Sequence, residues 1–341
     1  MTLSVVIRSK DEAERLSLTL VSLACQTEPC EVVVVNDGSS DATAEVLAAA
    51  EDQLDLKVVH HATARGRSAA SNAGARMATG DLLLFLDGDT LLAPDAVAHH
   101  LRAHETASNL IGRGNCRHLR CTRFLQDPQT ASPRIGEEVR LARLPDAERE
   151  ALRVTSDQIC NDFASIERRS EAGIYPGAGP RRLQEAEFEA LAQHPELPVL
   201  WATACGSNMS VRREAFQEAG GFDAGIDINE HRELALRLIQ AGHRMVAVEA
   251  AQSFHMTHRS GWRDPLKDQG WEKVFWARHP RLEVKLLPIF WASLSADPRL
   301  SEGERLPSLA ALAEAVINPS TFDPDAVRAR LGLAALEAPA P

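Results

Sequence analysis

Residues 80–90, GDLLLFLDGDT, decide the fold of this chain. The apolar run 82–86 is typical of a strand that is buried on both faces. The run ends at two aspartates, Asp87 and Asp89, which are separated only by a glycine. Two carboxylates at a strand end repel each other unless a cation lies between them, and their oxygens suit Mg²⁺ or Mn²⁺. A polar turn, in which Asp and Gly only supply turn geometry, explains the same residues equally well.

Three strand–helix units precede this stretch, and a fourth helix follows it. Each unit has a short β-branched or apolar run, then polar residues, then a helical stretch. The sequence therefore predicts an α/β fold with a doubly wound, mostly parallel sheet flanked by helices. The expected strands are 3–7, 31–35, 57–60 and 82–86, and the expected helices include 16–23, 42–50 and 68–77 and one that starts at Pro94.

Charged residues follow the predicted strands at the point where each strand ends. Arg8, Asp37, Arg65 and Asp87 all lie at or just after such an end. Sheets of this kind bind ligands beyond the carboxyl ends of their strands, so we expect the four residues to converge on one crevice. Taken singly, each of them could be an ordinary charge on a surface loop.

Composition and charge argue against several classes of protein. The 341 residues carry 37 Lys and Arg against 48 Asp and Glu, a net charge of -11 that opposes non-specific binding to nucleic acid or anionic membranes. No uncharged apolar run is long enough for an integral membrane segment and no signal peptide is recognisable, so we expect a cytoplasmic protein. Six cysteines without a C-x-x-C pair predict free thiols rather than disulfides or a zinc site: Cys25, Cys30, Cys116, Cys121, Cys160 and Cys205.

The second half of the chain has weaker patterns between residues 112 and 198. The stretches 137–153 and 181–192 are expected to be charged helices, separated by a loop rich in Gly and Pro at 175–180. Helices are expected again at 213–219 and 230–241, followed by a short strand at 245–248. That strand leads to a pair of histidines, His255 and His258. One histidine is more often structural than a ligand, but two at this spacing after a strand suggest a metal site.

Taken in order, these segments resemble the family 2 glycosyltransferases with the GT-A fold. The stretch SVVIRSKDEAERLSLTLVSL is similar to the family's first strand and helix, VVVVNDGSSDAT to its nucleotide-binding turn, and ARGRSAASNAGARMATGDLLLFLDGDT to the segment that runs into its D-x-D strand. CGSNMSVRREAFQEAGGFD and EHRELALRLIQAG resemble its acceptor-side segments. The resemblance covers roughly residues 2–105 and 200–258, and it rests on the order of motifs that are individually weak.

The resemblance implies a division of the chain and an activity. Residues 1–110 would bind the nucleotide sugar, and 111–260 would form the acceptor-binding and catalytic half, with 120–198 as an insertion or lid. Residues 261–341 would form a helical C-terminal extension. The implied reaction is the metal-dependent transfer of a sugar, with inversion, from a nucleoside diphosphate sugar to a hydroxyl of a saccharide or other acceptor.

The resemblance also assigns roles to residues. Asp89 would bind Mn²⁺ or Mg²⁺, Asp87 would contact the metal or the ribose, and His255 would be the third ligand, with His258 as the alternative. Asp37 would accept a hydrogen bond from the base or ribose, and Arg8, Arg65 or Arg67 would face the diphosphate. The full expected donor site is Arg8, Lys10, Glu12, Asp37, Arg65, Arg67 and Asp87.

The sequence departs from the family at the predicted catalytic base. The family's Glu-Asp pair is Glu230-His231 here, so either residue is the candidate base, and a histidine can accept a proton near neutral pH. Trp201 and Trp262 could stack on a sugar ring or simply pack in the core.

Two alternative functions remain beside this one. A non-catalytic nucleotide-sugar-binding protein would explain the missing aspartate. A sugar-phosphate nucleotidyltransferase would share the architecture, but it would be expected to have a glycine-rich loop soon after the first strand, and residues 8–16 contain no glycine.

Overall fold

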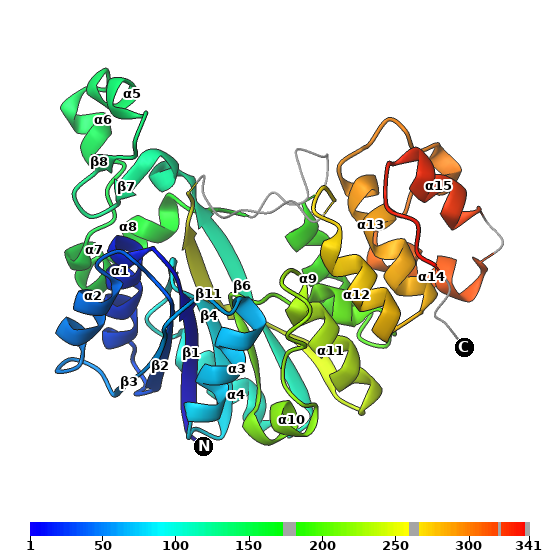
Figure 1. Cartoon of the computed structure of the whole chain (residues 1–341), viewed down its shortest axis with the longest axis horizontal. Coiled ribbons are helices and arrows are strands. Elements are labelled where there is room, and N and C mark those ends of the chain that lie inside the picture. The colour runs from blue at the N-terminus through cyan, green and yellow to red at the C-terminus, as the bar shows by residue number, and fades with distance from the viewer. Residues whose placement is uncertain (173–181, 259–265, 320–321, 338–341) are drawn as a thin grey trace.

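The computed structural model of the protein describes residues 1–172, 182–258, 266–319 and 322–337. Within these residues a large sheet with helices on both sides confirms the predicted α/β fold (Figure 1). The expected strands and helices of the first hundred residues are all present. They are β1 (Leu3–Ser9), α1 (Ala13–Ala24), β2 (Glu31–Asp37), α2 (Thr43–Ala50), β3 (Leu56–His61), α3 (Arg67–Met77), β4 (Leu82–Asp87) and α4 (Ala96–Glu105). A short strand that was not expected, β5 (Thr90–Leu92), lies between β4 and α4.

The sheet order is β3-β2-β1-β4-β10-β6-β11-β5, and its first four strands are parallel throughout. The second half is mixed, because β10 (Met209–Arg212) runs antiparallel between β4 and β6 (Leu110–Leu119). β11 (Arg244–Met256) is parallel to β6 and antiparallel to β5. β9 (Glu171–Ala172) pairs with the end of β6.

Alternating side chains of the parallel strands pack against helices on the two faces of the sheet. Val5 and Ile7 of β1 share a core with α1, α2 and α4, whereas Val6 faces the other way. On that second face α3, α10 (Arg213–Glu218) and α11 (Glu230–Gln240) cover the sheet. The continuously apolar strands are therefore buried on both faces, as parallel strands between two helix layers must be.

The strand expected at 245–248 is much longer in the structure, because β11 continues to Met256. The predicted strand ended where the apolar run ends, and the register against β6 shifts there, between Val248 and Gln252. The intervening Glu249 and Ala250 are exposed. A bulge of this kind lets a strand resume after an interruption in its apolar pattern. It carries β11 on to His255.

The segment between β6 and β10, which we call the insertion, begins with elements that project from one end of the sheet, whereas its last α-helix lies beside the C-terminal helices (Figure 1). The helix expected at 137–153 is two short helices in the structure, because Pro145 sets an extended backbone between them. The predicted loop 175–180 lies outside the described residues. The insertion's elements are η1 (Arg120–Phe124), β7 (Leu125–Asp127), β8 (Ser132–Pro133), α5 (Glu138–Ala142), α6 (Asp146–Glu150), α7 (Ser156–Asn161), α8 (Phe163–Arg168) and α9 (Leu183–Gln193).

The prediction of free thiols for all six cysteines is wrong for one pair. Cys25, at the end of α1, forms a disulfide with Cys160 of α7, and their Cα atoms are 5.6 Å apart. The two residues are 135 positions apart in the sequence. The spacing of the cysteines in the sequence gave no sign of this disulfide, because the pairing depends on how α7 folds back against α1. Among the described cysteines, the other four are free thiols, as predicted.

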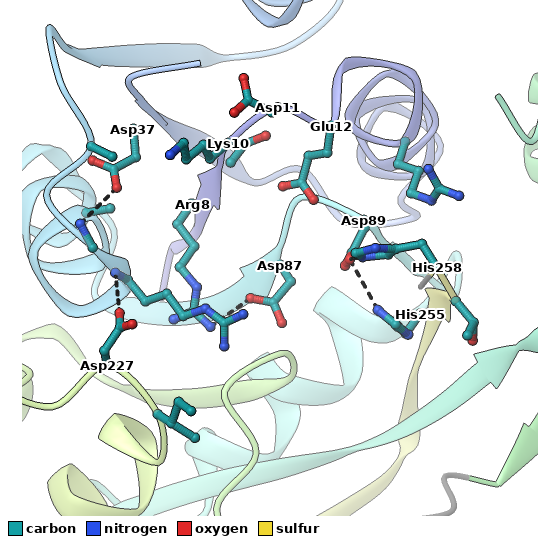
Figure 2. A pocket seen from close by; sticks show the side chains of 18 of the residues that line it. Arg8, Lys10, Asp11, Glu12, Asp37, Asp87, Asp89, Asp227, His255 and His258 are labelled. Atoms are coloured by element: carbon teal, nitrogen blue, oxygen red, sulfur yellow. Dashed lines mark hydrogen bonds and ion pairs between the residues drawn. The ribbon is translucent and has the colours of Figure 1, made fainter. Parts of the chain in front are cut away.

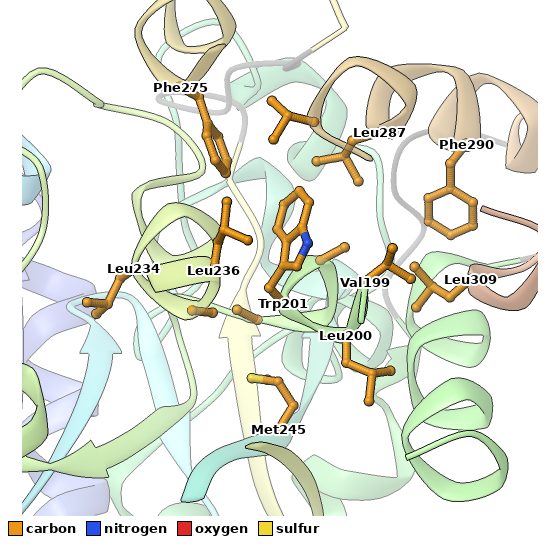
Figure 3. Packing of buried hydrophobic residues seen from close by; sticks show 14 of the residues in the cluster. Val199, Leu200, Trp201, Leu234, Leu236, Met245, Phe275, Leu287, Phe290 and Leu309 are labelled. Carbon is orange, nitrogen blue, oxygen red and sulfur yellow. The ribbon is translucent and has the colours of Figure 1, made fainter. Parts of the chain in front are cut away.

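The C-terminal helices share one apolar core with the second half of the sheet (Figure 3). Trp201 is fully buried in this core, where its ring contacts Phe275 edge-on. Core packing is thus the correct interpretation of Trp201, while Trp262 lies outside the described residues. The helices involved are η2 (Leu200–Thr203), α12 (Gly270–Arg278), α13 (Leu282–Leu294), α14 (Leu309–Ile317) and α15 (Pro324–Arg330).

Within the described residues, no helix is both long and apolar enough to cross a membrane.

Gly74 of α3 tests the packing of this helix on the parallel strands. A Cβ at this position would lie 2.6 Å from Cγ1 of Val6 and 3.1 Å from Cγ2 of Val35. Alanine favours helices over glycine by about 1 kcal/mol, so only the clash can make Gly74→Ala destabilising. We expect this variant to lower the free energy of unfolding in urea by about 1–3 kcal/mol.

Gly303→Ala is the matched control, because a Cβ at position 303 would have no atom within 4 Å. A Gly74→Ala variant as stable as the wild type would contradict the close approach of α3 to the sheet.

Candidate functional site

A cavity of about 1110 Å³ opens beyond the carboxyl ends of β1, β2 and β4. The parallel register aligns these ends, with Arg8 opposite Asp87 and Asn36 opposite Ser9. Of the residues assigned from the sequence, Arg65 and Glu230 do not line the cavity but contact residues that do. The assigned residues that line it are Arg8, Lys10, Glu12, Asp37, Arg67, Asp87, Asp89, His231, His255 and His258 (Figure 2).

Asp37 fixes the loop that precedes α3. Its two carboxylate oxygens accept hydrogen bonds from the backbone N–H groups of Arg65 (2.9 Å) and Gly66 (3.0 Å). His61 Nδ1 lies 2.6 Å from Asp37 Oδ1. Gly38 has a φ of +72°, and a Cβ there would lie 2.6 Å from the nitrogen of Ala64, so this close approach requires glycine. The turn after β2 and the start of α3 therefore form one wall of the cavity.

Arg8 joins two carboxylates from opposite sides of the cavity. Its Nη2 lies 3.0 Å from Asp87 Oδ1, and its Nη1 donates to Glu230 Oε1 at 2.7 Å. Burial would raise the pKa of Glu230, but the Arg8 guanidinium and the neighbouring His231 lower it well below its usual range. Glu230 is therefore ionised, and it holds Arg8 against the end of β4.

Asp89, His255 and His258 form a cluster that could hold a metal ion (Figure 2). One potential ligand atom from each lies within 4.8 Å of the others. Asp89 Oδ2 is 3.2 Å from His255 Nε2 and 2.7 Å from His258 Nε2. A carboxylate with two imidazoles suits a transition ion such as Mn²⁺ better than Mg²⁺, which prefers oxygen ligands throughout. We call these three residues the metal-binding triad.

The protonation of the triad fits a site for a cation. Burial would raise the pKa of Asp89, but the two histidines lower it well below its usual range. Burial would likewise lower the pKa of His255, but Asp89 beside it raises that pKa. A bound metal ion would take the place of the two histidines in offsetting the charge of the buried carboxylate.

Asp87 and Glu12 flank the triad without belonging to it. Asp87 is paired with Arg8. His258, which the sequence offered only as the alternative third ligand, is grouped with Asp89 and His255, whereas Asp87 is not part of that group. Glu12 packs against Gly88, where any side chain would collide with its carboxylate. Burial and the nearby Asp89 raise the pKa of Glu12 well above its usual range. A cation bound at the triad would lower this pKa again and favour the ionised carboxylate.

His231 lies at the start of α11, where Arg232 contacts its ring. Arg232 Nη1 is 3.0 Å from His231 Nε2, and a guanidinium can only donate, so Nε2 is the acceptor and Nδ1 carries the proton. Nδ1 is buried without a hydrogen-bond partner among the described residues, with Glu230 Oε2 3.8 Å away. Arg232 also donates to Glu187 (3.2 Å) and Asn229 (2.7 Å). The basic lone pair of His231 is therefore occupied in this arrangement.

Several residues of the cavity were missed from the sequence. His118 of β6 stands opposite His255 in the sheet register, 3.3 Å away between their Nδ1 atoms. Burial and the neighbouring His255 lower the pKa of His118 to about 4. Asp227, just before α11, accepts a hydrogen bond from the backbone of Arg67. The missed residues also include four arginines of α1 and the insertion: Arg15, Arg120, Arg123 and Arg134.

Comparison with known proteins identifies sequence relatives of this chain. Residues 4–169 match the model of the family described as "Glycosyl transferase family 2". An uncharacterized glycosyltransferase, YfnE of Bacillus subtilis, is 28% identical over 274 residues, which are 76% of this chain and 66% of that protein. Validoxylamine A glucosyltransferase of Streptomyces hygroscopicus subsp. jinggangensis is 32% identical over 229 residues, 65% of this chain and 47% of that protein. The matches therefore span less than two thirds of either relative.

Solved structures support the fold. TarS 1–349 of S. aureus, in complex with UDP-GlcNAc, aligns with 97% of this chain and 84% of its own, at a TM-score of 0.56 and 13% identity. GalNAc-T7 with UDP, GalNAc and Mn²⁺ aligns with 83% of this chain and 51% of its own, at a TM-score of 0.51 and 18% identity. At such low identity these matches bear on the fold alone, and they confirm the GT-A architecture.

The triad predicts which side chains bind a divalent ion. We expect His258→Ala to weaken Mn²⁺ binding by at least about tenfold. Removing a residue that merely hydrogen-bonds to a metal ligand already weakens metal binding about 10- to 100-fold, and removing a ligand should cost no less. Asp87→Asn should weaken it less, since Asp87 is paired with Arg8. Titration calorimetry with Mn²⁺ measures both variants. His99→Ala on the exposed side of α4 is the control, and equal losses in His258→Ala and His99→Ala would contradict the site.

Proposed function

We propose that this chain belongs to glycosyltransferase family 2 and that it transfers a sugar from a nucleoside diphosphate sugar to an acceptor hydroxyl. The observation that carries this proposal is the convergence of three features on one cavity: the loop fixed by Asp37, the Arg8 guanidinium and the metal-binding triad. A nucleotide, a diphosphate and a divalent ion need such features side by side. The sequence relative named a glucosyltransferase supports the same reaction class.

The donor would lie along the ends of the parallel strands. Asp37 and the loop it fixes would bind the nucleoside, and Lys10 and Glu12, from the segment after β1, line the same cavity. Arg8 and Arg67 would face the diphosphate, because both residues line the cavity. Arg65 would contribute through its backbone, which is already bonded to Asp37, more than through its side chain.

The triad would hold Mn²⁺, with Asp87 and Glu12 adjacent to it. The ion would offset the negative charge that grows on the leaving diphosphate. Arg8 acts on the same charge from the other side, and Glu230 keeps its guanidinium in place. The acceptor hydroxyl would attack the anomeric carbon from the face opposite the diphosphate, which inverts its configuration.

His231 is the proposed proton acceptor. Glu230 is buried, paired with Arg8 and strongly acidic, so it is a poor base. His231 lines the cavity, and its Nε2 would exchange the bond from Arg232 for one from the acceptor hydroxyl. Glu230 then serves to position Arg8 and the His231 ring.

The donor reaction separates this function from its alternatives. We expect the protein to release a nucleoside diphosphate from a nucleotide sugar in the presence of Mn²⁺, as measured by chromatography over a panel of common donors. Asp89→Asn should reduce this release at least about 100-fold, because the charge on the leaving group is no longer offset. Asp95→Asn, an exposed aspartate on the N-terminal side of α4, is the control.

Other products would point to another function. Nucleotide binding without any release would favour a non-catalytic binding protein. Release of pyrophosphate from a nucleoside triphosphate and a sugar phosphate would favour a nucleotidyltransferase.

The role of His231 has its own test. We expect His231→Asn to lower the turnover number about 100- to 10,000-fold, the usual contribution of a general base. The affinity for the nucleoside diphosphate and Mn²⁺ should stay within about twofold of the wild type, because the triad and Asp37 are untouched. Wild-type turnover in His231→Asn would assign the proton transfer to another group.

A further inference from the structure

The insertion contributes a group of arginines to the cavity on the side away from Asp37. Arg120 and Arg123 lie on η1, directly after β6, and Arg134 follows β8. In the sheet, β6 is separated from β2 by β1, β4 and β10. The arginines therefore come from a part of the sheet remote from Asp37, and the proposed donor site does not use them.

This wall is fixed to the site by hydrogen bonds. The Thr122 hydroxyl donates to the Thr257 carbonyl at 2.9 Å, and the Arg134 backbone N–H donates to the Phe124 carbonyl at 2.9 Å. Arg15 of α1, which is 5% exposed, donates to the carbonyls of Leu125 (2.7 Å), Gln126 (3.1 Å) and Met256 (3.3 Å). The arginines are thus held on a structured wall beside the end of β11.

Two polar groups on this wall are buried with nothing to bind. Arg134 Nη1 and Thr257 Oγ1 have no hydrogen-bond partner in the part of the chain that the structure describes. Both residues line the cavity. A buried donor without an acceptor is costly, and most such groups in proteins are satisfied by protein, water or ligand.

The charge of the wall is also uncompensated. Arg123 lies over the ring of Phe124, 4.4 Å from its centroid, and within the described residues neither Arg123 nor Arg134 forms an ion pair with a carboxylate. Arg120 forms one ion pair, with the exposed Glu171, at the long distance of 3.7 Å. In a chain whose net charge is -11, unpaired guanidinium groups gathered at one cavity wall favour an anion there.

We propose that Arg123, Arg134 and Thr257 form a subsite that binds a phosphate group of the acceptor. Guanidinium groups and a hydroxyl match the geometry and charge of phosphate oxygens. The assignment to the acceptor rests on the proposed function, in which Arg8, Arg67 and the triad already meet the donor's diphosphate. The acceptor class is then a phosphorylated polyol or saccharide, soluble or carried by a lipid.

The test measures binding of glycerol 3-phosphate to the full chain with Mn²⁺ and UDP present. Titration calorimetry should detect binding to the wild type at millimolar concentrations, and none for glycerol. The double variant Arg123→Gln, Arg134→Gln should bind at least about tenfold more weakly, since two charge-assisted hydrogen-bond donors are lost. Arg134→Lys alone should retain more of the affinity than Arg134→Gln.

Arg140→Gln is the matched control. The Arg140 guanidinium also lies 4.4 Å from the centroid of the Phe124 ring, but it pairs with Glu137 and does not line the cavity. Its glycerol 3-phosphate affinity should equal that of the wild type. Vesicles with and without phosphatidic acid, in a co-sedimentation assay, separate a lipid-borne phosphate from a soluble one.

Three results would overturn the subsite. The first is that glycerol 3-phosphate does not bind to the wild type. The second is that the double variant binds it as tightly as the wild type does. The third is that the double variant loses as much affinity for UDP as for glycerol 3-phosphate. The last would assign the arginines to the donor's diphosphate. A failure of nucleotide-sugar cleavage would instead overturn the proposed function, and it would leave the difference in phosphate binding between the double variant and Arg140→Gln intact.

Discussion

The ion pairs of Arg8 are the constraint on which the cavity depends. Arg8 leaves the end of β1 and reaches both Asp87 at the end of β4 and Glu230 at the start of α11. Its guanidinium therefore joins the parallel half of the sheet to a helix that lies more than 200 residues later in the sequence. Removing one carboxylate would leave buried charge partly unpaired, which is far more costly than losing an exposed ion pair. The positions of β4, α11 and the cavity floor are thus coupled.

Three further arginines connect segments that are far apart in the chain. Arg15 binds three carbonyls of β7 and β11, and Arg113 of β6 shares the carboxylate of Glu187 with Arg232. Glu187 lies on α9, so the insertion is bonded both to the sheet and to the residue that contacts His231. Paired and fully hydrogen-bonded charges of this kind restrict how α9 and α11 can sit relative to each other. The insertion is consequently part of the site's framework.

The sequence was informative where the chemistry is local. Periodicity located the first four strands, and their ends located Arg8, Asp37 and Asp87, because parallel strands align their carboxyl ends without any knowledge of distant contacts. It was uninformative where partners are far apart. Cys25 and Cys160 meet only because α7 packs on α1, and the polar Glu249 concealed the continuation of β11. His118 and Arg134 lie in a segment whose pattern was too weak to place them in the cavity. A residue could thus be assigned to the site from the sequence when its position follows from neighbouring residues, and it was missed when its position depends on contacts with distant parts of the chain.

Electrostatics explains why position 231 holds a histidine and not an aspartate. Its ring lies 3.8 Å from the ionised Glu230, whose one guanidinium partner, Arg8, is already shared with Asp87. A second carboxylate at position 231 would face Glu230 at close range in a buried setting, where like charges repel strongly. An imidazole avoids this repulsion because it carries no negative charge, and it still offers a lone pair, which Arg232 now occupies. The departure from the family's Glu-Asp pair is therefore compatible with a base at this position, provided that Arg232 can release it.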